Sequence, residues 1–297
     1  MKILITGGTG LIGKSLVEKL RERGHTVNVL IREGQTETEG FLWSFSEGKI
    51  DDAAFNGIES IIHLAGAPIA QHWSKSYKDI IIRSRTESAD FLLNECKKRN
   101  IRLKSFVSAS GVHYHGATTT NQILTEKDGI LRNDFLSQVC QKWENATHQF
   151  GEISDRVVIL RTAAVLSKNG GAFLELNTLA ERNLASGIGS GKQWFNWIHI
   201  DDMVNMYVEA VENPEMNGTY NAVADEIPTN KQFMKKLAKA NRKFFMPFNV
   251  PGFMMKLALG EMSEMLLKGT RVSNEKIKSQ GFDFKYSDLD SAFKNLV

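Results

Sequence analysis

Seven consecutive residues near the N-terminus, Gly7 to Gly13, have the glycine content and spacing of a loop that holds phosphates. Their glycines fit the spacing Gly8-x-Gly10-x-x-Gly13 and also Gly7-x-x-Gly10-x-x-Gly13. Glycine suits such a loop because the turn is tight, the backbone touches a pyrophosphate, and the next helix packs closely on the preceding strand. Freed N–H groups and the positive end of the helix dipole attract the phosphates. The alternative is a purely structural turn. We predict a dinucleotide site, with candidate contacts from Gly7, Thr9, Gly10, Leu11, Ile12 and Gly13.

An arginine at the end of the next apolar segment indicates which dinucleotide binds. Proteins that prefer NAD usually place a carboxylate there, which accepts a hydrogen bond from the ribose 2′-hydroxyl. Here the segment ends Leu30-Ile31-Arg32, and a guanidinium suits a 2′-phosphate instead. Glu33 follows directly, and a solvated loop arginine is the alternative interpretation. The sequence favours NADP (NADPH) over NAD.

The flanking residues supply the elements that must position this loop. Ile3 to Ile5 form a short apolar run typical of a buried strand. After the loop, apolar residues recur at helical spacing from Ile12 to Leu20, and Gly24 stands where a helix C-cap is expected. Thr26 to Ile31 then resumes as a second apolar strand. Together these segments predict the βαβ unit that binds dinucleotides.

The alternation of strands and helices continues as far as Arg161. Further strands are predicted at 41–43, 58–64, 104–108 and 156–160, and helices at 75–99 and 134–150. We therefore predict an α/β protein with a Rossmann-type, doubly wound parallel sheet. In such a sheet the loops at the carboxyl ends of the strands line the cofactor crevice. Further cofactor contacts are therefore expected from Leu64, Ala65, Gly66 and Ser108.

Beyond Arg161 the pattern becomes less regular. A glycine-rich loop at 187–191 leads into an aromatic segment, after which Asp201 or Asp202 could cap the next helix. From about Thr229 onward the chain is expected to be largely helical.

This last region is also rich in methionine. The cluster is expected to be adaptable core packing, and it comprises Met254, Met255, Met262 and Met265. We predict a NAD(P)-binding Rossmann domain over residues 1–225, with substrate-side insertions after about 165. A smaller, mainly helical domain is predicted over residues 226–297.

The composition is that of an ordinary globular protein and argues against several function classes. The 297 residues are 42% hydrophobic and 24% charged, with a formal net charge of +3. Basic residues are scattered, which argues against nucleic acid binding. Cys96 and Cys140 lie far apart and form no metal-ligand cluster, which fits a reducing cytoplasm. No apolar run approaches membrane-spanning length, and the immediate first strand leaves no room for a signal peptide. We expect a soluble cytoplasmic protein.

Several short motifs resemble those of one large enzyme superfamily across nearly the whole chain. They are the glycine loop, His63-Leu64-Ala65-Gly66, Ser84-Arg85, Ser108-Ala109-Ser110, Trp143-Glu144, Arg161, Gly189 to Trp194, Trp197 to Asp202, and Gly281-Phe282-Asp283-Phe284. With these motifs the chain resembles an extended, atypical short-chain dehydrogenase/reductase. More narrowly, it resembles the nucleoside-diphosphate-sugar epimerase-like proteins, whose C-terminal segment is a small domain of unknown function.

The resemblance implies a catalytic serine but not the usual catalytic pair. Typical members use a serine, a tyrosine and a lysine four residues after the tyrosine, with the tyrosine transferring the proton. Ser110 occupies the serine position, whereas the other two positions fall near Leu136 and Cys140. Either another acid–base group has taken over, or the protein binds NADP without turnover. The candidate substitutes are Tyr114, His113, His115, His199 and Glu126.

Three further residues are candidates for contacting a substrate. Trp194 and Trp197 could stack on a sugar or base, or could pack in the core. Arg161 could bind an anion or form a structural ion pair. The leading hypothesis is an NADP-dependent oxidoreductase or epimerase-like enzyme acting on an unidentified polar small molecule such as a nucleotide sugar. The alternative is a non-catalytic NADP-binding sensor. The resemblance also allows a homodimer, although no sequence pattern marks its interface.

Overall fold

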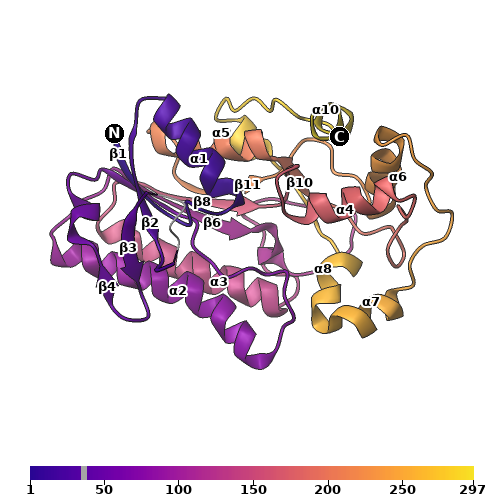
Figure 1. The fold of residues 1–297 in the computed structure, drawn as a ribbon, viewed down its shortest axis with the longest axis horizontal. Coiled ribbons are helices and arrows are strands. Elements are labelled where there is room, and N and C mark those ends of the chain that lie inside the picture. Colours follow the sequence, from indigo (N-terminus) through magenta and orange to yellow (C-terminus); the bar gives the residue numbers. More distant parts are fainter. Residues whose placement is uncertain (35–38) are drawn as a thin grey trace.

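One large sheet forms the centre of the computed structural model, which describes residues 1–34 and 39–297 (Figure 1). Within these residues, eight strands lie in the order β11-β8-β6-β5-β1-β2-β3-β4. All neighbours are parallel except β3 and β4. The strands are β1 (Lys2–Thr6), β2 (Thr26–Ile31), β3 (Phe41–Ser44), β4 (Lys49–Ile50), β5 (Ser60–His63), β6 (Ser105–Gly111), β8 (Val157–Thr162) and β11 (Gly218–Ala222).

The strand order reverses at β1. The chain adds β2 and β3 on one side of β1 and then returns to add β5 on the other side. In the register of β1 and β5, Thr6 lies opposite His63, so both strands end at the same edge of the sheet. In open α/β sheets, ligands bind outside the carboxyl ends of the strands at such a reversal. The fold therefore places the glycine loop at the predicted cofactor crevice.

Helices cover both faces of this sheet. In Figure 1, α1 (Leu11–Glu22) and α5 (Ile200–Glu212) lie over one face, and α2 (Lys75–Lys98) and α3 (Phe135–His148) lie over the other. The side chains of Ser74 and Asp134 cap α2 and α3 by accepting hydrogen bonds from the N–H groups three residues later. The predicted α/β class with a doubly wound, Rossmann-type parallel sheet is confirmed.

Shorter helices lie between these elements and after them. They are α4 (Ala172–Glu181), α6 (Asn230–Ala240), α7 (Gly252–Leu259), α8 (Glu264–Leu267), α9 (Glu275–Lys278), α10 (Leu289–Leu296) and 3-10 helices at Asp52–Phe55, Val112–His115, Gln149–Glu152 and Gly260–Ser263. Two small parallel pairs join β9 (Ala164–Leu166) to β10 (Trp197–His199) and β7 (Ile123–Leu124) to β12 (Arg271–Val272). The second pair ties the C-terminal region to the loop after β6. The region from Thr229 onward is mainly helical, as expected.

The predicted cap of α5 is wrong. His199 is the N-cap residue, and its Nδ1 accepts a hydrogen bond from the Asp201 N–H at 3.1 Å. The Asp202 carboxylate instead accepts hydrogen bonds from the N–H groups of Lys285 (2.9 Å) and Tyr286 (3.0 Å). Asp202 therefore fixes the C-terminal segment to α5, a role that depends on residues more than eighty positions away.

The expected burial of the methionine cluster is also wrong. Met254 is 51% exposed, and Met255, Met262 and Met265 are at most partly buried. The described part of α7 contains no buried residue, because that helix lies at the periphery beside the 3-10 helix that follows it. The third core cluster of the protein forms elsewhere, around Trp197, Phe233 and Phe293.

None of the helices in the described ranges is both long enough and apolar enough to span a membrane.

Candidate functional site

A cavity of about 530 Å³ extends from the glycine loop past the carboxyl end of β6 to residues 265–270 of the C-terminal region. Its walls come from the start of α1, the end of β6, helix α3 and the C-terminal region. Gly10 and Gly13 line one part, Ser110 and Cys140 another, and Trp194 a third. One continuous space therefore joins the predicted phosphate-binding loop to the predicted substrate side.

The geometry of the glycine loop fits a pyrophosphate. Gly7 has φ +69°, and a Cβ there would lie 2.8 Å from the carbonyl carbon of Leu64. A Cβ on Gly13 would lie 2.2 Å from the Gly7 oxygen, so the start of α1 packs directly on the loop. Gly10, the N-cap residue, forms no side-chain cap, and the first turn of α1 contains no acidic residue. The helix N-terminus is therefore suited to an anion.

The structure brings most of the predicted cofactor contacts to this cavity. Its lining includes Gly7, Gly10, Leu11, Ile12, Gly13 and Leu64. Thr9 and Ala65 are partly buried beside it, and Gly66 and Arg32 are exposed, the latter directly after β2.

Ser108 is the exception among these predictions. Its side chain is fully buried in the sheet, and its hydroxyl donates to the Ala109 carbonyl at 3.0 Å. The cavity lining that β6 contributes begins at Ala109 and continues with Ser110 and Gly111, so Ser108 lies one residue before the part of the strand that reaches the cavity. The predicted cofactor contact from Ser108 is therefore wrong.

The predicted catalytic serine lies in a buried polar cluster. Ser110 lines the cavity, and its hydroxyl donates to Oε1 of Glu144 at 2.7 Å. The Arg161 guanidinium binds the same carboxylate through Nε and Nη2, both at 2.9 Å. Arg161 and Glu144 are almost entirely buried. The structure therefore favours the ion-pair interpretation of Arg161 over that of an anion-binding substrate contact.

The residues predicted as alternative acid–base groups mostly form other contacts. The Tyr114 ring lies 3.5 Å from the Arg161 guanidinium carbon and is not part of the cavity wall, which corrects its assignment as a catalytic residue. His115 and His199 are buried, and their rings bond to Gly129 O and to Asn295. Glu126 accepts a hydrogen bond from the Asn221 N–H at 2.8 Å. His113 does line the cavity, and burial lowers its pKa.

The resemblance to typical relatives predicts the tyrosine and lysine positions near Leu136 and Cys140 on α3. Leu136 and Cys140 both face the cavity from α3. Burial raises the pKa of the Cys140 thiol to about 12, so the thiol stays protonated at neutral pH and is a poor nucleophile. Leu136 and Cys140 therefore shape the cavity and do not supply acid–base chemistry.

The two tryptophans have different roles. Trp194 is partly exposed and lines the cavity, while its Nε1 donates to the Thr120 carbonyl at 2.7 Å. Trp197 is fully buried in the third core cluster, and its Nε1 donates to the Glu226 carbonyl at 2.6 Å. The prediction that Trp197 contacts substrate is therefore wrong, and its alternative, core packing, is correct.

One residue of the cavity wall belongs to a motif of the resemblance but is not among the predicted site residues. Arg85, on α2, is 6% exposed, and its guanidinium carbon lies 4.9 Å from the Trp143 ring centroid. The Ser84-Arg85 motif of the resemblance pointed to the helix that flanks the crevice, by analogy with relatives, but it assigned Arg85 no contact of its own.

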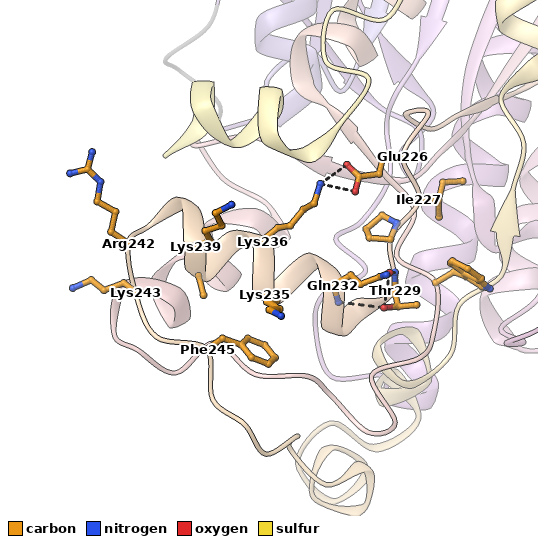
Figure 2. A pocket seen from close by; sticks show the side chains of 13 residues that line it. Glu226, Ile227, Thr229, Gln232, Lys235, Lys236, Lys239, Arg242, Lys243 and Phe245 are labelled. Atoms are coloured by element: carbon orange, nitrogen blue, oxygen red, sulfur yellow. Dashed lines mark hydrogen bonds and ion pairs between the residues drawn. The ribbon is translucent and has the colours of Figure 1, made fainter.

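A second cavity, of about 800 Å³, lies beside α6 (Figure 2). Apart from Trp194, its lining residues belong to the C-terminal third of the chain, and none is in the glycine loop. In Figure 2, Lys236 is paired with Glu226, while Arg242 and Lys243 extend outward from the end of α6. Its polar groups do not converge on a common point, so we take the first cavity as the candidate site. Within the described ranges, no three His, Cys, Asp or Glu residues are grouped as metal ligands.

Family models match most of the chain. The model of the NAD dependent epimerase/dehydratase family matches residues 3–223. A second model, a domain of unknown function (DUF1731), matches residues 250–296. These are the two components that the sequence motifs implied.

Individual relatives extend over the full chain. An epimerase family protein of Staphylococcus haemolyticus is 33% identical over 300 residues, covering 100% of this chain and 99% of the relative. The crystal structure of human epimerase family protein SDR39U1 with NADPH has a TM-score of 0.89 and 28% identity, covering 100% of this chain and 99% of the human chain. A nucleoside-diphosphate sugar epimerase from Corynebacterium glutamicum has a TM-score of 0.79 and 29% identity, covering 98% of this chain and 57% of that one. The chain thus belongs to the NAD dependent epimerase/dehydratase family.

Proposed function

We propose that this protein binds NADPH beside the glycine loop and acts as an oxidoreductase or epimerase-like enzyme. Its substrate would be a polar carbonyl or alcohol compound, a class that includes nucleotide sugars. The observation that carries this proposal is the single cavity that joins the uncapped start of α1 to Ser110 and Trp194. The human relative, which was solved with NADPH, supports the choice of cofactor.

The residues at the glycine loop fit the pyrophosphate of a dinucleotide. Gly7 and Gly13 leave a space that a Cβ would fill, and the first N–H groups of α1 would hold the phosphates. When bound, the nicotinamide would supply or accept a hydride. Ser110 could then turn its hydroxyl from Glu144 toward a substrate oxygen, while the carboxylate remains neutralised by Arg161. His113 is the titratable imidazole in the same wall and the candidate proton carrier.

Preference for NADPH over NADH would come from Arg32. This residue is exposed directly after β2, where the adenosine ribose binds in dinucleotide-binding folds. A guanidinium–phosphate contact contributes roughly 1.5–3 kcal/mol, or about ten- to a hundredfold in affinity.

The first experiment is a titration of the protein with NADPH and with NADH, repeated on Arg32→Ala. Arg21→Ala is a matched control, because it removes an exposed arginine from the last turn of α1. The proposal expects tighter binding of NADPH, a preference lost in Arg32→Ala and kept in Arg21→Ala. Failure of both nucleotides to bind would remove the cofactor site, and equal affinities would remove the NADP assignment.

A second function, a non-catalytic NADPH-binding sensor, is favoured by one observation. Leu136 and Cys140 line the cavity, and the resemblance predicts the tyrosine and lysine of typical relatives near these two positions. Ser110→Ala separates the two functions in an assay of NADPH oxidation with a panel of aldehydes and ketones. An enzyme consumes NADPH and loses that activity in the variant while keeping its NADPH affinity. A sensor binds NADPH but consumes none in either form.

We also propose that the chain divides functionally near residue 225. The segment after this point contributes Met265, Leu266, Gly269 and Thr270 to the wall opposite the glycine loop. Residues 226–297 would then complete the substrate side of a cofactor domain formed by residues 1–225. This division agrees with family models that end at 223 and begin again at 250.

A further inference from the structure

Arg85 is a buried cation in the cavity wall that has no anionic partner in the described part of the chain. Its Nη1 donates to the Ile81 carbonyl at 2.9 Å, and its Nη2 donates to the Ala67 carbonyl at 3.1 Å. The Nε atom is buried without a hydrogen-bond partner. Burial lowers the pKa of Arg85 to about 10, which still leaves the guanidinium charged at neutral pH. A buried charge without a counter-ion is strongly unfavourable, so its presence requires an explanation.

Two other arginines, the buried Arg161 and the partly buried Arg156, show how this protein satisfies such groups. Arg161 uses Nε and Nη2 as a fork on the Glu144 carboxylate. Arg156 donates to the backbone carbonyls of Ala210, Met216 and Val211. Arg85 has no carboxylate partner in the described ranges, and backbone carbonyls accept from its Nη1 and Nη2 but not from its Nε. Its unused Nε lies on the same edge of the guanidinium that Arg161 presents to Glu144, next to an Nη2 with a second hydrogen to donate.

The position of Arg85 indicates which kind of ligand would neutralise its charge and accept its free hydrogen bonds. The Arg85 guanidinium lies over the Trp143 ring. Gly66 also packs against it, so closely that a Cβ on Gly66 would lie 2.8 Å from the guanidinium carbon. The same cavity is lined by Ser110 and Cys140. Its other cationic lining residue, Lys268, already has Glu264 at 3.7 Å. Among the described residues, the wall therefore carries one uncompensated positive charge, which a planar monoanion can neutralise with two parallel hydrogen bonds.

We propose that the substrate carries a carboxylate group and that Arg85 is the residue that binds it. This inference rests on the proposed function, since it assigns the substrate class of the same NADPH-dependent site. The acid group would occupy the Arg85 end of the cavity, and the apolar side chains of Leu136 and Val139 would surround the remainder of the molecule. A carbonyl or hydroxyl group on that molecule would then face Ser110.

The test uses the NADPH-loaded protein and two probes of the same shape, benzoate and benzamide. Both are titrated at pH 7 and constant ionic strength, with the change in melting temperature and ligand-observed NMR as readouts. Charge-assisted hydrogen bonds to the carboxylate are expected to make benzoate bind about tenfold or more tightly than benzamide. Equal binding of the two probes, or binding of neither, overturns the proposal.

Three variants test whether Arg85 is the residue that causes the preference for benzoate over benzamide. Arg85→Met should abolish the preference for benzoate, Arg85→Lys should retain part of it, and Lys268→Met should leave it unchanged. A preference that survives Arg85→Met, or that disappears only in Lys268→Met, overturns the assignment to Arg85. The affinity for NADPH is measured on the same samples. If the wild-type protein binds NADPH but shows no preference for the acid, this inference fails while the proposed function stands; if NADPH does not bind, the proposed function fails first.

Discussion

The Oγ1 atom of Thr6 lies 2.9 Å from Nδ1 of His63, and both residues are fully buried where β1 and β5 end. The same Oγ1 accepts hydrogen bonds from the N–H groups of Leu64 and Ala65, both at 3.1 Å. With its oxygen accepting twice, the hydroxyl donates its own hydrogen to His63, which makes Nδ1 the acceptor of a neutral ring. Thr6 therefore fixes both the tautomer of His63 and the path of the chain behind the glycine loop.

Replacing Thr6 by valine should destabilise the protein by about 2–4 kcal/mol, because it leaves the Ala65 N–H and the His63 ring nitrogen without a partner, while the Leu64 N–H keeps only the Thr6 carbonyl at 3.2 Å. Urea unfolding followed by circular dichroism measures the change. Thr6→Ser keeps the hydroxyl and should lose at most about 1 kcal/mol. Equal losses in the two variants would show that the methyl group, and not the hydrogen bonds, carries the effect.

The buried His63 should also make stability depend on pH. Burial lowers its pKa from 6.5 to about 4 in the folded protein. The unfolded chain then binds more protons than the folded one between these values, so stability falls as the pH drops from about 6.5 to 4. His63 alone should account for a loss of about 3 kcal/mol by pH 4.

Burial lowers the pKa of His113, His115 and His199 as well, so the effect of His63 must be isolated from theirs. The measurement is the free energy of unfolding of wild type and of His63→Asn at several pH values. The variant lacks the titrating ring, and its stability should therefore decline less steeply between pH 6.5 and 4. Parallel curves would contradict the assignment.

The parts of the fold that the sequence predicted are those governed by neighbours in the chain. Apolar runs and glycine spacing located β1, β2 and the loop between them, and helix α2 begins at Lys75 as predicted because Ser74 caps it locally. The glycine loop also lines the cavity. Such features depend on residues within one or two turns of each other.

The features that sequence reasoning missed depend on distant partners. Trp197 is buried by residues of α6 and α10, and Asp202 is not a helix cap because the chain returns at Lys285 to use its carboxylate. Arg85 becomes an unpaired buried cation only because the cavity lies beside that turn of α2. No spacing rule within one segment contains that information, since it arises when separate elements pack together.

Two glycines of the loop should separate stability from cofactor binding. A Cβ on Gly13 would lie 2.2 Å from the Gly7 oxygen, so Gly13→Ala should destabilise the protein by about 1–3 kcal/mol. Gly10 has φ −77°, which alanine adopts readily, and its nearest obstacle is 3.3 Å away. Gly10→Ala should therefore stay within about 1 kcal/mol of wild type.

Because Gly10 lines the cavity, its added methyl group should still weaken NADPH binding by roughly tenfold. Gly129→Ala is the control, since that position has no positive φ and no atom within 4 Å of the added methyl group. Urea unfolding and NADPH titration on the three variants make the comparison. Unchanged NADPH affinity in Gly10→Ala would mean that the phosphates bind elsewhere.

The ion pair of Arg161 and Glu144 should behave as a single structural unit. Both side chains are buried, so Glu144→Gln leaves an uncompensated guanidinium and should destabilise the protein by about 3–5 kcal/mol. Arg161→Met should have a similar effect, whereas the double variant should lose much less than the sum. The exposed pair Arg83–Glu87 is the matched control, and Arg83→Ala should change stability by less than about 0.5 kcal/mol. Additive losses in the double-mutant cycle would show that the two side chains stabilise the protein independently and would reopen Arg161 as a ligand-binding residue.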